Sequence, residues 1–495
     1  MNEIEQTLRR EMQAQMEQRI YAPSMLALLK DYAKTQPDRL CIADPDECLT
    51  YAAFVARIER KARQLCALGA KKGECILGTA AQRGDYLALH FAAHRLGAVF
   101  VPLEKNLPAE RIEAIRAETG AKLVFSSSRL PEEERAFDAP LPAPEDTATI
   151  LFTTGTTGLS KGIELSHRAE VAVAQNVFYG TEMEPDTIEL VPTPVNHSYG
   201  LRHTFGLLLG GRSVVLCDGV TMAEDFFSMM DRYAVNALSL TPASVNILLH
   251  LTGERLGTYA GRIRYLQLGT AGVDAAMKER LRQLFPHSRL YQYYSSTEAG
   301  CACLFDFRND HSARRVGKPA CNSRFAIMND AGECIESSEK NWGYIACAGP
   351  MNMKGYYNEP ELTKQTMVRG YVRSQDIGYL DEEGYLCFVG RAGDVINTGG
   401  NKVAPEEVES AAMFFDGILE CACSAEADAL LGQVPVLYVV PERPDVPFDT
   451  AGLLAFLAQR LETFKQPRKV VLLRAVPRNY MGKPQRKRCR DAQRL

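Results

Sequence analysis

Apolar runs of strand length alternate with stretches of helical periodicity over the first quarter of the chain. Apolar side chains recur every three or four positions in three stretches, which predicts helices at 52–69, 85–96 and 108–119. The intervening apolar runs predict buried strands at 74–78, 98–103 and 122–125. Strands that alternate with helices indicate a largely parallel, doubly wound α/β layer.

The pattern changes on either side of this region. Residues 3–20 form an amphipathic helical pattern with both charge signs on the polar face, which favours packing on the protein body or a partner subunit. Residues 126–147, rich in Ser, Pro and acid, predict a surface loop. Later apolar runs predict strands at 150–152, 214–216 and 237–240, and two more strands that lead into 269–272 and 295–300. Because ligands bind at the carboxyl ends of strands in open parallel sheets, we expect the site there.

Composition narrows the class of protein. The 495 residues are too many for one hydrophobic core, and 46% hydrophobic with 24% charged residues is typical of globular proteins, so two or more domains are expected. A net charge of −4 argues against general binding to nucleic acid or anionic membrane. No apolar run reaches the about 18 residues of a membrane span, and the start lacks a signal-peptide core. The 14 cysteines include no CxxC pair, which favours a reduced, cytoplasmic protein without a cysteine metal site.

One segment has the composition of a phosphate-binding loop. The apolar run at 150–152 leads into threonines, glycines and a lysine: Thr153, Thr154, Gly155, Thr156, Thr157, Gly158 and Lys161. Glycine lets the backbone approach phosphate closely, hydroxyl and N–H groups donate to it, and lysine adds a mobile positive charge. The P-loop of nucleotide hydrolases requires a different spacing between its glycine and its lysine. A Gly/Thr-rich linker is the other interpretation, and the buried strand directly before the segment argues against it.

This segment resembles the phosphate-binding signature of the adenylate-forming superfamily, which contains acyl- and aryl-CoA synthetases, luciferases and peptide-synthetase adenylation domains. Ser160 departs from that signature, which usually has proline there. Further blocks in the same order extend the resemblance over about residues 45–490. It implies an α/β fold with a large N-terminal domain of doubly wound sheets and an accessory β-barrel (1–390). A small, mobile α+β C-terminal domain (391–495) would follow, with its hinge near Gly393.

The resemblance also implies roles for residues at the strand ends. Tyr294 would stack on adenine, Thr297 would contact the α-phosphate, and Glu298 would hold Mg²⁺, which prefers carboxylate oxygen. His197, in a turn after an apolar strand, would act beside the carboxylate of the acid substrate. Ala271 would lie on the nucleotide side, and the rest of the acid pocket would consist of Tyr199, Arg202, Gly269, Tyr293 and Ser295.

Three residues of the later blocks complete the implied site. Asp376 would accept hydrogen bonds from both ribose hydroxyls, a task that suits a carboxylate with two oxygens. Arg391 would reach the nucleotide. Lys483 would be the catalytic lysine, although the basic cluster around it, viewed alone, is also typical of a solvated tail or a nucleic-acid patch.

The implied function is that of an AMP-forming acid–thiol ligase that uses ATP and Mg²⁺. A carboxylic acid would become an acyl-adenylate with release of pyrophosphate, and coenzyme A would then take the acyl group. Transfer to a carrier-protein phosphopantetheine is the main alternative, and a non-catalytic nucleotide-binding regulator is a third. The pocket set is compatible with an aryl or oxygenated acid larger than acetate, and a medium or long fatty acid stays open. Both a monomer and a homodimer stay open.

Overall fold

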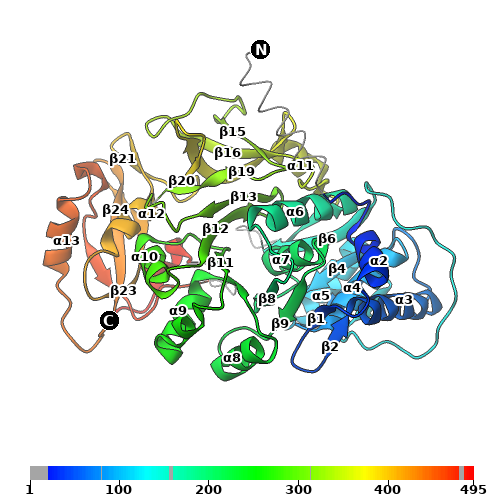
Figure 1. The fold of residues 1–495 in the computed structure, drawn as a ribbon. Coiled ribbons are helices and arrows are strands. Elements are labelled where there is room, and N and C mark those ends of the chain that lie inside the picture. The colour runs from blue at the N-terminus through cyan, green and yellow to red at the C-terminus, as the bar shows by residue number, and fades with distance from the viewer. Residues whose placement is uncertain (1–19, 80, 155–159, 313, 479–483) are drawn as a thin grey trace, which may run out of the picture.

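The computed structural model describes residues 20–79, 81–154, 160–312, 314–478 and 484–495 (Figure 1). The strands of these residues form three sheets. The predicted helix at 3–20 lies outside the described residues except for its last position, so it stays a prediction.

The largest sheet joins a parallel part to an antiparallel part. In spatial order, its parallel strands are β12 (Arg289–Ser296), β11 (Tyr265–Leu268), β10 (Ala237–Leu240), β8 (Ile188–Val191), β9 (Ser213–Leu216) and β1 (Leu40–Ala43), and β2 (Cys48–Thr50) pairs antiparallel with β1. Beyond β12 the antiparallel strands are β13 (Gly300–Asp306), β14 (Arg315–Pro319), β20 (Leu386–Arg391), β19 (Tyr371–Leu380), β16 (Gly343–Ala348) and β15 (Arg324–Met328), with β18 (Met367–Val368) beside β19. This antiparallel part lies where the accessory barrel is expected, and the strands described pair along an open path.

The second sheet carries the predicted phosphate loop. Its order is β17 (Gly355–Tyr356), β7 (Ser160–Ser166), β6 (Thr147–Thr154), β4 (Val99–Leu103), β3 (Cys75–Thr79) and β5 (Leu123–Phe125). The strands β6 and β7 form an antiparallel hairpin that places Thr153 opposite Lys161. The residues after the loop therefore continue a strand to Ser166, and helical structure begins at His167.

Helices form the layers between and outside the two sheets. The main core lies between the sheets and is formed by α2 (Met25–Thr35), α3 (Tyr51–Ala67), α4 (Gly84–Arg95), α6 (His167–Gly180) and α7 (Ser198–Leu209). A second core lies under α8 (Ala223–Arg232), α9 (Pro242–Thr252) and α10 (Ala275–Leu284), with η1 (Arg255–Tyr259) beside them, on the other face of the parallel strands. The outer face of the second sheet packs on α5 (Ala109–Thr119). The predicted doubly wound α/β architecture is confirmed.

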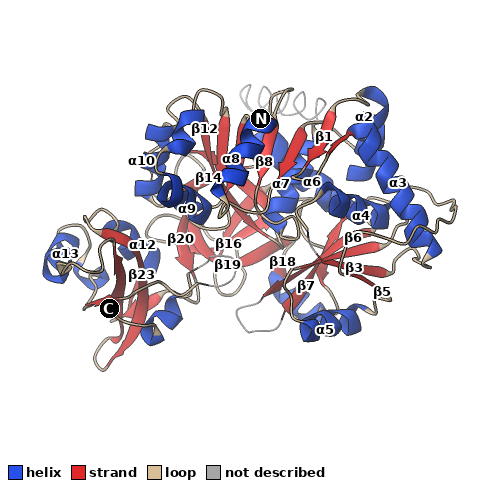
Figure 2. Cartoon of the chain, turned by 90° about the horizontal axis from the view of Figure 1, so that it is seen from below, coloured by secondary structure: helices blue, strands red, loops and turns tan. Residues whose placement is uncertain are grey.

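The third sheet forms a separate group at the C-terminal end (Figure 2). It contains β22 (Asn401–Val403), β21 (Ile396–Thr398), β24 (Gly432–Pro441), β23 (Ile418–Asp428) and β25 (Val470–Leu472). Around it lie α12 (Pro405–Ala412), α13 (Thr450–Ala458), η2 (Thr463–Lys465) and η3 (Arg486–Asp491), and α11 (Pro360–Thr366) precedes β18. This sheet has its own apolar core. The domain boundary at residue 390 and the hinge stay predictions.

Local sequence explains where several helices begin. The hydroxyl of Ser166 accepts a hydrogen bond from the Ala169 N–H at the start of α6, and Asp274 does the same for Met277 at the start of α10. Proline opens α12, followed by Glu406 in the first turn, where the helix dipole favours acids. Among the helices described, none is long and apolar enough to cross a membrane. All 14 cysteines, which lie in described segments, are thiols.

Candidate active site

The nucleotide end of the candidate site lies where β12, β19 and β20 meet. The strands β19 and β20 pair so that Asp376 lies directly opposite Arg391. Asp376 Oδ2 accepts a hydrogen bond from the Tyr294 hydroxyl at 3.1 Å, and Asp376 Oδ1 lies 3.2 Å from Arg391 Nε. Burial, with this carboxylate, raises the pKa of the Tyr294 hydroxyl, which therefore stays protonated and donates. These contacts use two of about four acceptor positions on the carboxylate, so it retains acceptor capacity for the hydroxyl groups of a ligand.

The turn that follows β12, residues 297–299, carries the predicted magnesium ligand. Glu298 Oε1 accepts a hydrogen bond from the Tyr356 hydroxyl at 2.9 Å. Lys161 Nζ lies 5.7 Å from the centre of the Tyr356 ring, within the range of a cation–π contact. Tyr356 therefore connects the lysine of the predicted phosphate loop to the turn. Tyr356 is not among the site residues predicted from the sequence.

Arg202, predicted as a pocket residue, holds the backbone of this turn. Its guanidinium donates to the carbonyl oxygens of Ser296 and Thr297, both at 2.8 Å, and the side chain is buried. Beside it, the Thr297 hydroxyl donates to Ser198 Oγ at 3.2 Å. Burial lowers the pKa of the Arg202 guanidinium, which keeps its charge at neutral pH because an arginine starts from a very high pKa. These contacts indicate a positioning role, and direct contact with the acid stays a prediction.

Aromatic side chains fill the space beside the end of β11. The ring centroids of Tyr199 and Tyr293 lie 5.4 Å apart, and the ring centroid of His203 lies 4.4 Å from that of Tyr199. A Cβ on Gly269 would come within 2.2 Å of Tyr199 Cε2, so only glycine accommodates the tyrosine ring at this position. The structure therefore brings three predicted pocket residues together. It adds His203, for which the one sequence signal was its four-residue spacing from Tyr199 on a helix.

The other predicted residues flank this group. His197 directly precedes α7, and burial lowers the pKa of its imidazole to about 4, so the ring is neutral near pH 7. Ser295 pairs with Cys301 beside an irregularity in the register of β12. Ala271 follows Thr270, whose φ of 73° is rare for a residue other than glycine.

Part of the predicted site lies outside the described residues. This applies to Gly155, Thr156, Thr157 and Gly158 of the phosphate loop and to the predicted catalytic residue Lys483. Their neighbours Thr153 and Thr154 end β6.

Among the contacts that join the C-terminal sheet to the rest of the described chain, an apolar cluster lies around Ala404 and two contacts involve charged side chains. Arg314 Nη2 lies 2.8 Å from Glu407 Oε1, and Lys402 Nζ lies 5.1 Å from the centre of the Trp342 ring. At the predicted hinge, a Cβ added to Gly393 would have no heavy atom of the described residues within 4 Å, so close packing does not require glycine there.

Two family models match the chain. The AMP-binding enzyme model matches residues 29–357, which is more than half of the chain, and the AMP-binding enzyme C-terminal domain matches residues 407–483. The chain belongs to the AMP-binding enzyme family. The predicted membership of the adenylate-forming superfamily is confirmed.

Relatives and solved structures narrow the class within the AMP-binding enzymes. The chain is 27% identical over 487 residues to 2-succinylbenzoate–CoA ligase of Bacillus subtilis, with 94% of this chain and 97% of the relative covered. It is 28% identical over 475 residues to feruloyl-CoA synthase of Amycolatopsis, with 91% and 95% covered.

The structural comparison agrees. The complex of Bacillus subtilis o-succinylbenzoate CoA synthetase with its acyl-adenylate intermediate has a TM-score of 0.81 at 25% identity, over 94% of this chain and 98% of that one. ATP-bound MatB from Rhodopseudomonas palustris has a TM-score of 0.83 at 26% identity, over 95% and 99%. The predicted class, an acyl-/aryl-CoA synthetase that forms an acyl-adenylate with ATP, is confirmed.

Proposed function

We propose that this AMP-binding enzyme activates a compact aryl or oxygenated carboxylic acid for transfer to coenzyme A, at a site assembled around the turn at 297–299. The meeting of residues distant in sequence carries the proposal. Tyr294, just before the turn, and Arg391 both contact Asp376, whereas Glu298, within the turn, contacts Tyr356. This combination supplies acceptors for ribose hydroxyls and a carboxylate for a phosphate-bound cation in one place.

In the first half-reaction, a carboxylate oxygen of the acid attacks the α-phosphorus of ATP, and the bond to pyrophosphate breaks. A carboxylate nucleophile requires no general base, so the enzyme has to overcome charge repulsion and hold the reactants in line. Lys161 and Lys483 would supply positive charge, and Thr297 would donate to the α-phosphate. Arg202 would contribute indirectly by fixing the carbonyl groups of Ser296 and Thr297.

The site also fits a magnesium ion by its donor chemistry. Mg²⁺ is bound by one or two carboxylates together with substrate phosphates, and Glu298 provides such a carboxylate with its orientation fixed by Tyr356. Bound Mg²⁺ would neutralise charge on the phosphates of the leaving group.

In the second half-reaction, the thiol of coenzyme A loses its proton and attacks the acyl carbon, and AMP leaves. The C-terminal sheet would move about the region of Gly393 between the two steps and bring Lys402 towards the thiol. Glycine at position 393 tolerates large dihedral changes, which supports such movement. The contact of Glu407 with Arg314 and that of Lys402 with Trp342 would then break.

The aromatic group beside β11 supports a compact acid. Tyr199 and Tyr293 are each 4% exposed and His203 is fully buried, so these rings fill the space that a long acyl chain would need. The same face of the sheet is polar, since Gln267 on β11 is buried and neither of its amide atoms has a hydrogen-bond partner among the described residues. A substrate with hydroxyl, keto or further carboxyl groups would satisfy such an amide, whereas an alkyl tail would leave it unpaired.

An acid panel tests the proposal. Hydroxylated benzoates and cinnamates, short oxygenated acids and saturated fatty acids of increasing length are compared by pyrophosphate release with and without coenzyme A. We expect the highest kcat/KM among the aryl or oxygenated acids, and Tyr199→Ala should improve the use of longer acids while His250→Ala leaves the ranking unchanged. A maximum at long saturated chains in the unaltered enzyme contradicts the proposed acid class. Thioester formed on a holo-carrier protein but not on coenzyme A contradicts the proposed acceptor.

The role of Lys483 has its own test. Lys483→Ala should remove most adenylate formation and leave thioester formation from supplied acyl-adenylate largely intact, whereas Lys487→Ala in the same basic cluster should affect neither. Pyrophosphate exchange near the wild-type rate in the Lys483 variant contradicts the assignment. We place the reaction in the cytoplasm, which the 14 thiols support.

A further inference from the structure

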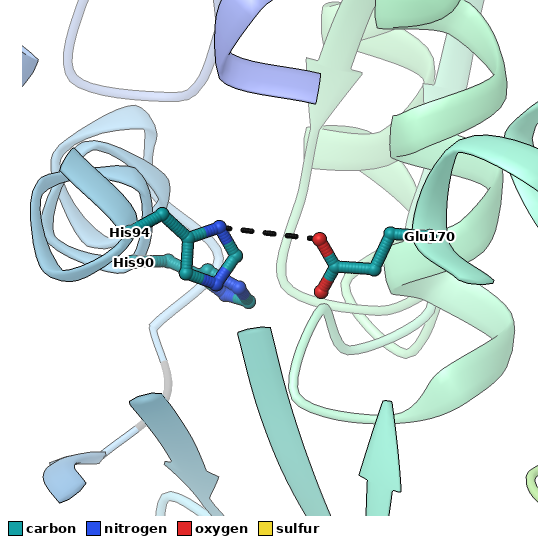
Figure 3. Close-up of side chains that lie close together, drawn as sticks. All are labelled: His90, His94 and Glu170. Atoms are coloured by element: carbon teal, nitrogen blue, oxygen red, sulfur yellow. Dashed lines mark ion pairs between the residues drawn. The ribbon is translucent and has the colours of Figure 1, made fainter. Parts of the chain in front are cut away.

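A cluster of imidazoles and one carboxylate lies in the main core, away from the proposed reaction site. His90 and His94 lie one turn apart on α4 and are near Glu170 of α6 (Figure 3). His167 lies three residues before Glu170, at the start of α6. One ligand atom each from His90, His94 and Glu170 lies within 4.8 Å of the others, and all three side chains are buried. His167 Nδ1 lies 4.0 Å from Glu170 Oε2.

Hydrogen bonds fix the protonation state of His94. Its Nε2 lies 2.9 Å from the Ala148 carbonyl oxygen, which can only accept, so Nε2 carries the hydrogen. With the hydrogen on Nε2, the neutral imidazole has its lone pair on Nδ1. That lone pair faces Glu170 Oε2 at 3.9 Å (Figure 3). Burial raises the pKa of the Glu170 carboxyl to about 8, so without a cation this group holds a proton at neutral pH, and at 3.9 Å the two atoms are too far apart for a hydrogen bond.

The remaining polar atoms of the cluster have the same deficit. Glu170 Oε1 accepts from the Thr149 hydroxyl at 2.7 Å, but Oε2 has no hydrogen-bond partner among the described residues. The same holds for the Nδ1 atoms of His90 and His94 and for both ring nitrogens of His167. Buried polar atoms normally have partners, and the ring nitrogens and carboxyl oxygen that lack them here are atoms that bind a cation.

We propose that His90, His94 and Glu170 bind one Zn²⁺ ion, with His167 as the fourth ligand. Zinc prefers imidazole nitrogen with carboxylate oxygen in four-coordinate sites, and bonds of about 2.0 Å at tetrahedral angles hold ligand atoms about 3.3 Å apart. His94 Nδ1 and His167 Nδ1 lie 3.9 Å and 4.0 Å from Glu170 Oε2, and the atoms of His90, His94 and Glu170 lie within 4.8 Å of one another, so the side chains would draw together around the ion to reach that spacing. The contact of His94 with the Ala148 carbonyl has the form of a second-shell hydrogen bond that orients a metal-binding imidazole.

The position of the cluster gives the ion a structural consequence. The zinc site joins α4 and α6 to β6 through Thr149, which lies four residues before Thr153 at the start of the phosphate loop. Glu170 also lines a small cavity of about 10 Å³ together with Ser198 and Arg202, two residues that contact the reaction-site turn. The bound ion therefore stabilises the support of the site without contacting the reactants.

Metal binding by the purified full-length enzyme tests the proposal. Metal is removed with a chelator, and Zn²⁺ alone is then titrated by calorimetry in the absence of ATP and Mg²⁺, with the melting temperature measured before and after. We expect one Zn²⁺ per chain, a higher melting temperature with zinc, and loss of both effects in His94→Gln and Glu170→Gln. The control His203→Gln alters another fully buried histidine, whose Nδ1 lies 3.4 Å from Glu189 Oε1 and whose ring packs against Tyr199, and should keep the zinc. Glu298→Gln should also keep it, which separates this site from the magnesium site.

Three results would overturn the proposal: no zinc uptake by the wild-type chain, unchanged uptake in the Glu170 variant, or loss of uptake in the Glu298 variant. If the histidine and glutamate variants do not fold, Co²⁺ bound to the wild-type chain decides the matter. Tetrahedral d–d bands without thiolate charge transfer support imidazole and carboxylate ligands. Thiolate charge transfer would assign the metal to cysteines and contradict the proposal, as would an octahedral spectrum.

Discussion

Asp376→Asn tests the nucleotide end of the site because it removes a charge and keeps the shape. In the unaltered enzyme the carboxylate is held by the Tyr294 hydroxyl at 3.1 Å and by Arg391 Nε at 3.2 Å. An asparagine can keep both neighbours, since its oxygen can accept from Arg391 and its amide nitrogen can donate to the tyrosine oxygen. The substitution should therefore weaken the hydrogen bonds to a bound ribose and leave the contacts with Tyr294 and Arg391 in place.

The expected size follows from the hydrogen bonds that a ribose would lose. A hydrogen bond to a charged group contributes about 1.5–3 kcal/mol. The amide retains part of the acceptor capacity, so we expect a net loss of about 2–3 kcal/mol. At about 1.4 kcal/mol per tenfold change, the KM for ATP should rise about 30- to 150-fold.

Asp381→Asn is the matched control. Asp381 lies on the same hairpin and pairs with Arg315 at 2.8 Å, and its side chain is 18% exposed against 12% for Asp376. Pyrophosphate release at varied ATP gives the two KM values, and thermal melting shows whether each variant is folded. If folded Asp376→Asn changes the KM for ATP less than about threefold, or no more than the control does, its assignment to the ribose is refuted.

Three further predictions concern the turn, the pocket and pH. Tyr356→Phe removes the hydrogen bond to Glu298, the predicted magnesium ligand, and should raise the Mg²⁺ concentration for half-maximal rate about tenfold. The control Tyr357→Phe should leave this concentration unchanged. Equal Mg²⁺ concentrations for the two variants would contradict the assigned contact. Gly269→Ala forces a tyrosine ring aside at a cost of about 1–3 kcal/mol and should raise the KM of the acid, whereas Gly272→Ala, with open space around it, should leave that KM unchanged. The folded-state pKa of His197 near 4 lies below the about 6.5 of an unfolded chain, so the unfolded chain takes up the proton first as pH falls. The contribution of His197 to the free energy of unfolding should therefore rise with pH between about 4 and 6.5 and then level off. In urea melts, His197→Gln should reduce the slope of stability against pH in that window, and an unchanged slope refutes the shift.

The sequence was sufficient to predict much of the fold because strand and helix periods differ and the chain keeps them distinct. The predicted helices at 52–69, 85–96 and 108–119 correspond to α3, α4 and α5, within a few residues at each end. The hairpin of β6 and β7 was harder to predict from the sequence. Glu164, Leu165 and Ser166 alternate too briefly to distinguish a strand from the approach to a helix, and pairing with β6 and β17 decides their conformation.

The candidate site also contains some residues that the sequence could predict and others that it could not. Residues inside motif-like blocks, such as Asp376 and Glu298, could be proposed from sequence because their spacing resembled a family pattern. The hydrogen bond of Tyr356 to Glu298 joins positions 58 residues apart, so local spacing contains no trace of it. The positioning role of Arg202 was hidden for another reason, since a sequence does not reveal whether a guanidinium faces a ligand or two backbone carbonyls.

The central claim is that this chain forms an acyl-adenylate and passes the acyl group to coenzyme A. The most direct measurement is the product balance with the best acid of the panel, by chromatography of the nucleotides and mass spectrometry of the thioester. The account predicts AMP, pyrophosphate and acyl-CoA in equal amounts, with acyl-adenylate accumulating when coenzyme A is left out. Formation of ADP and phosphate, or the absence of AMP with every acid, would contradict it.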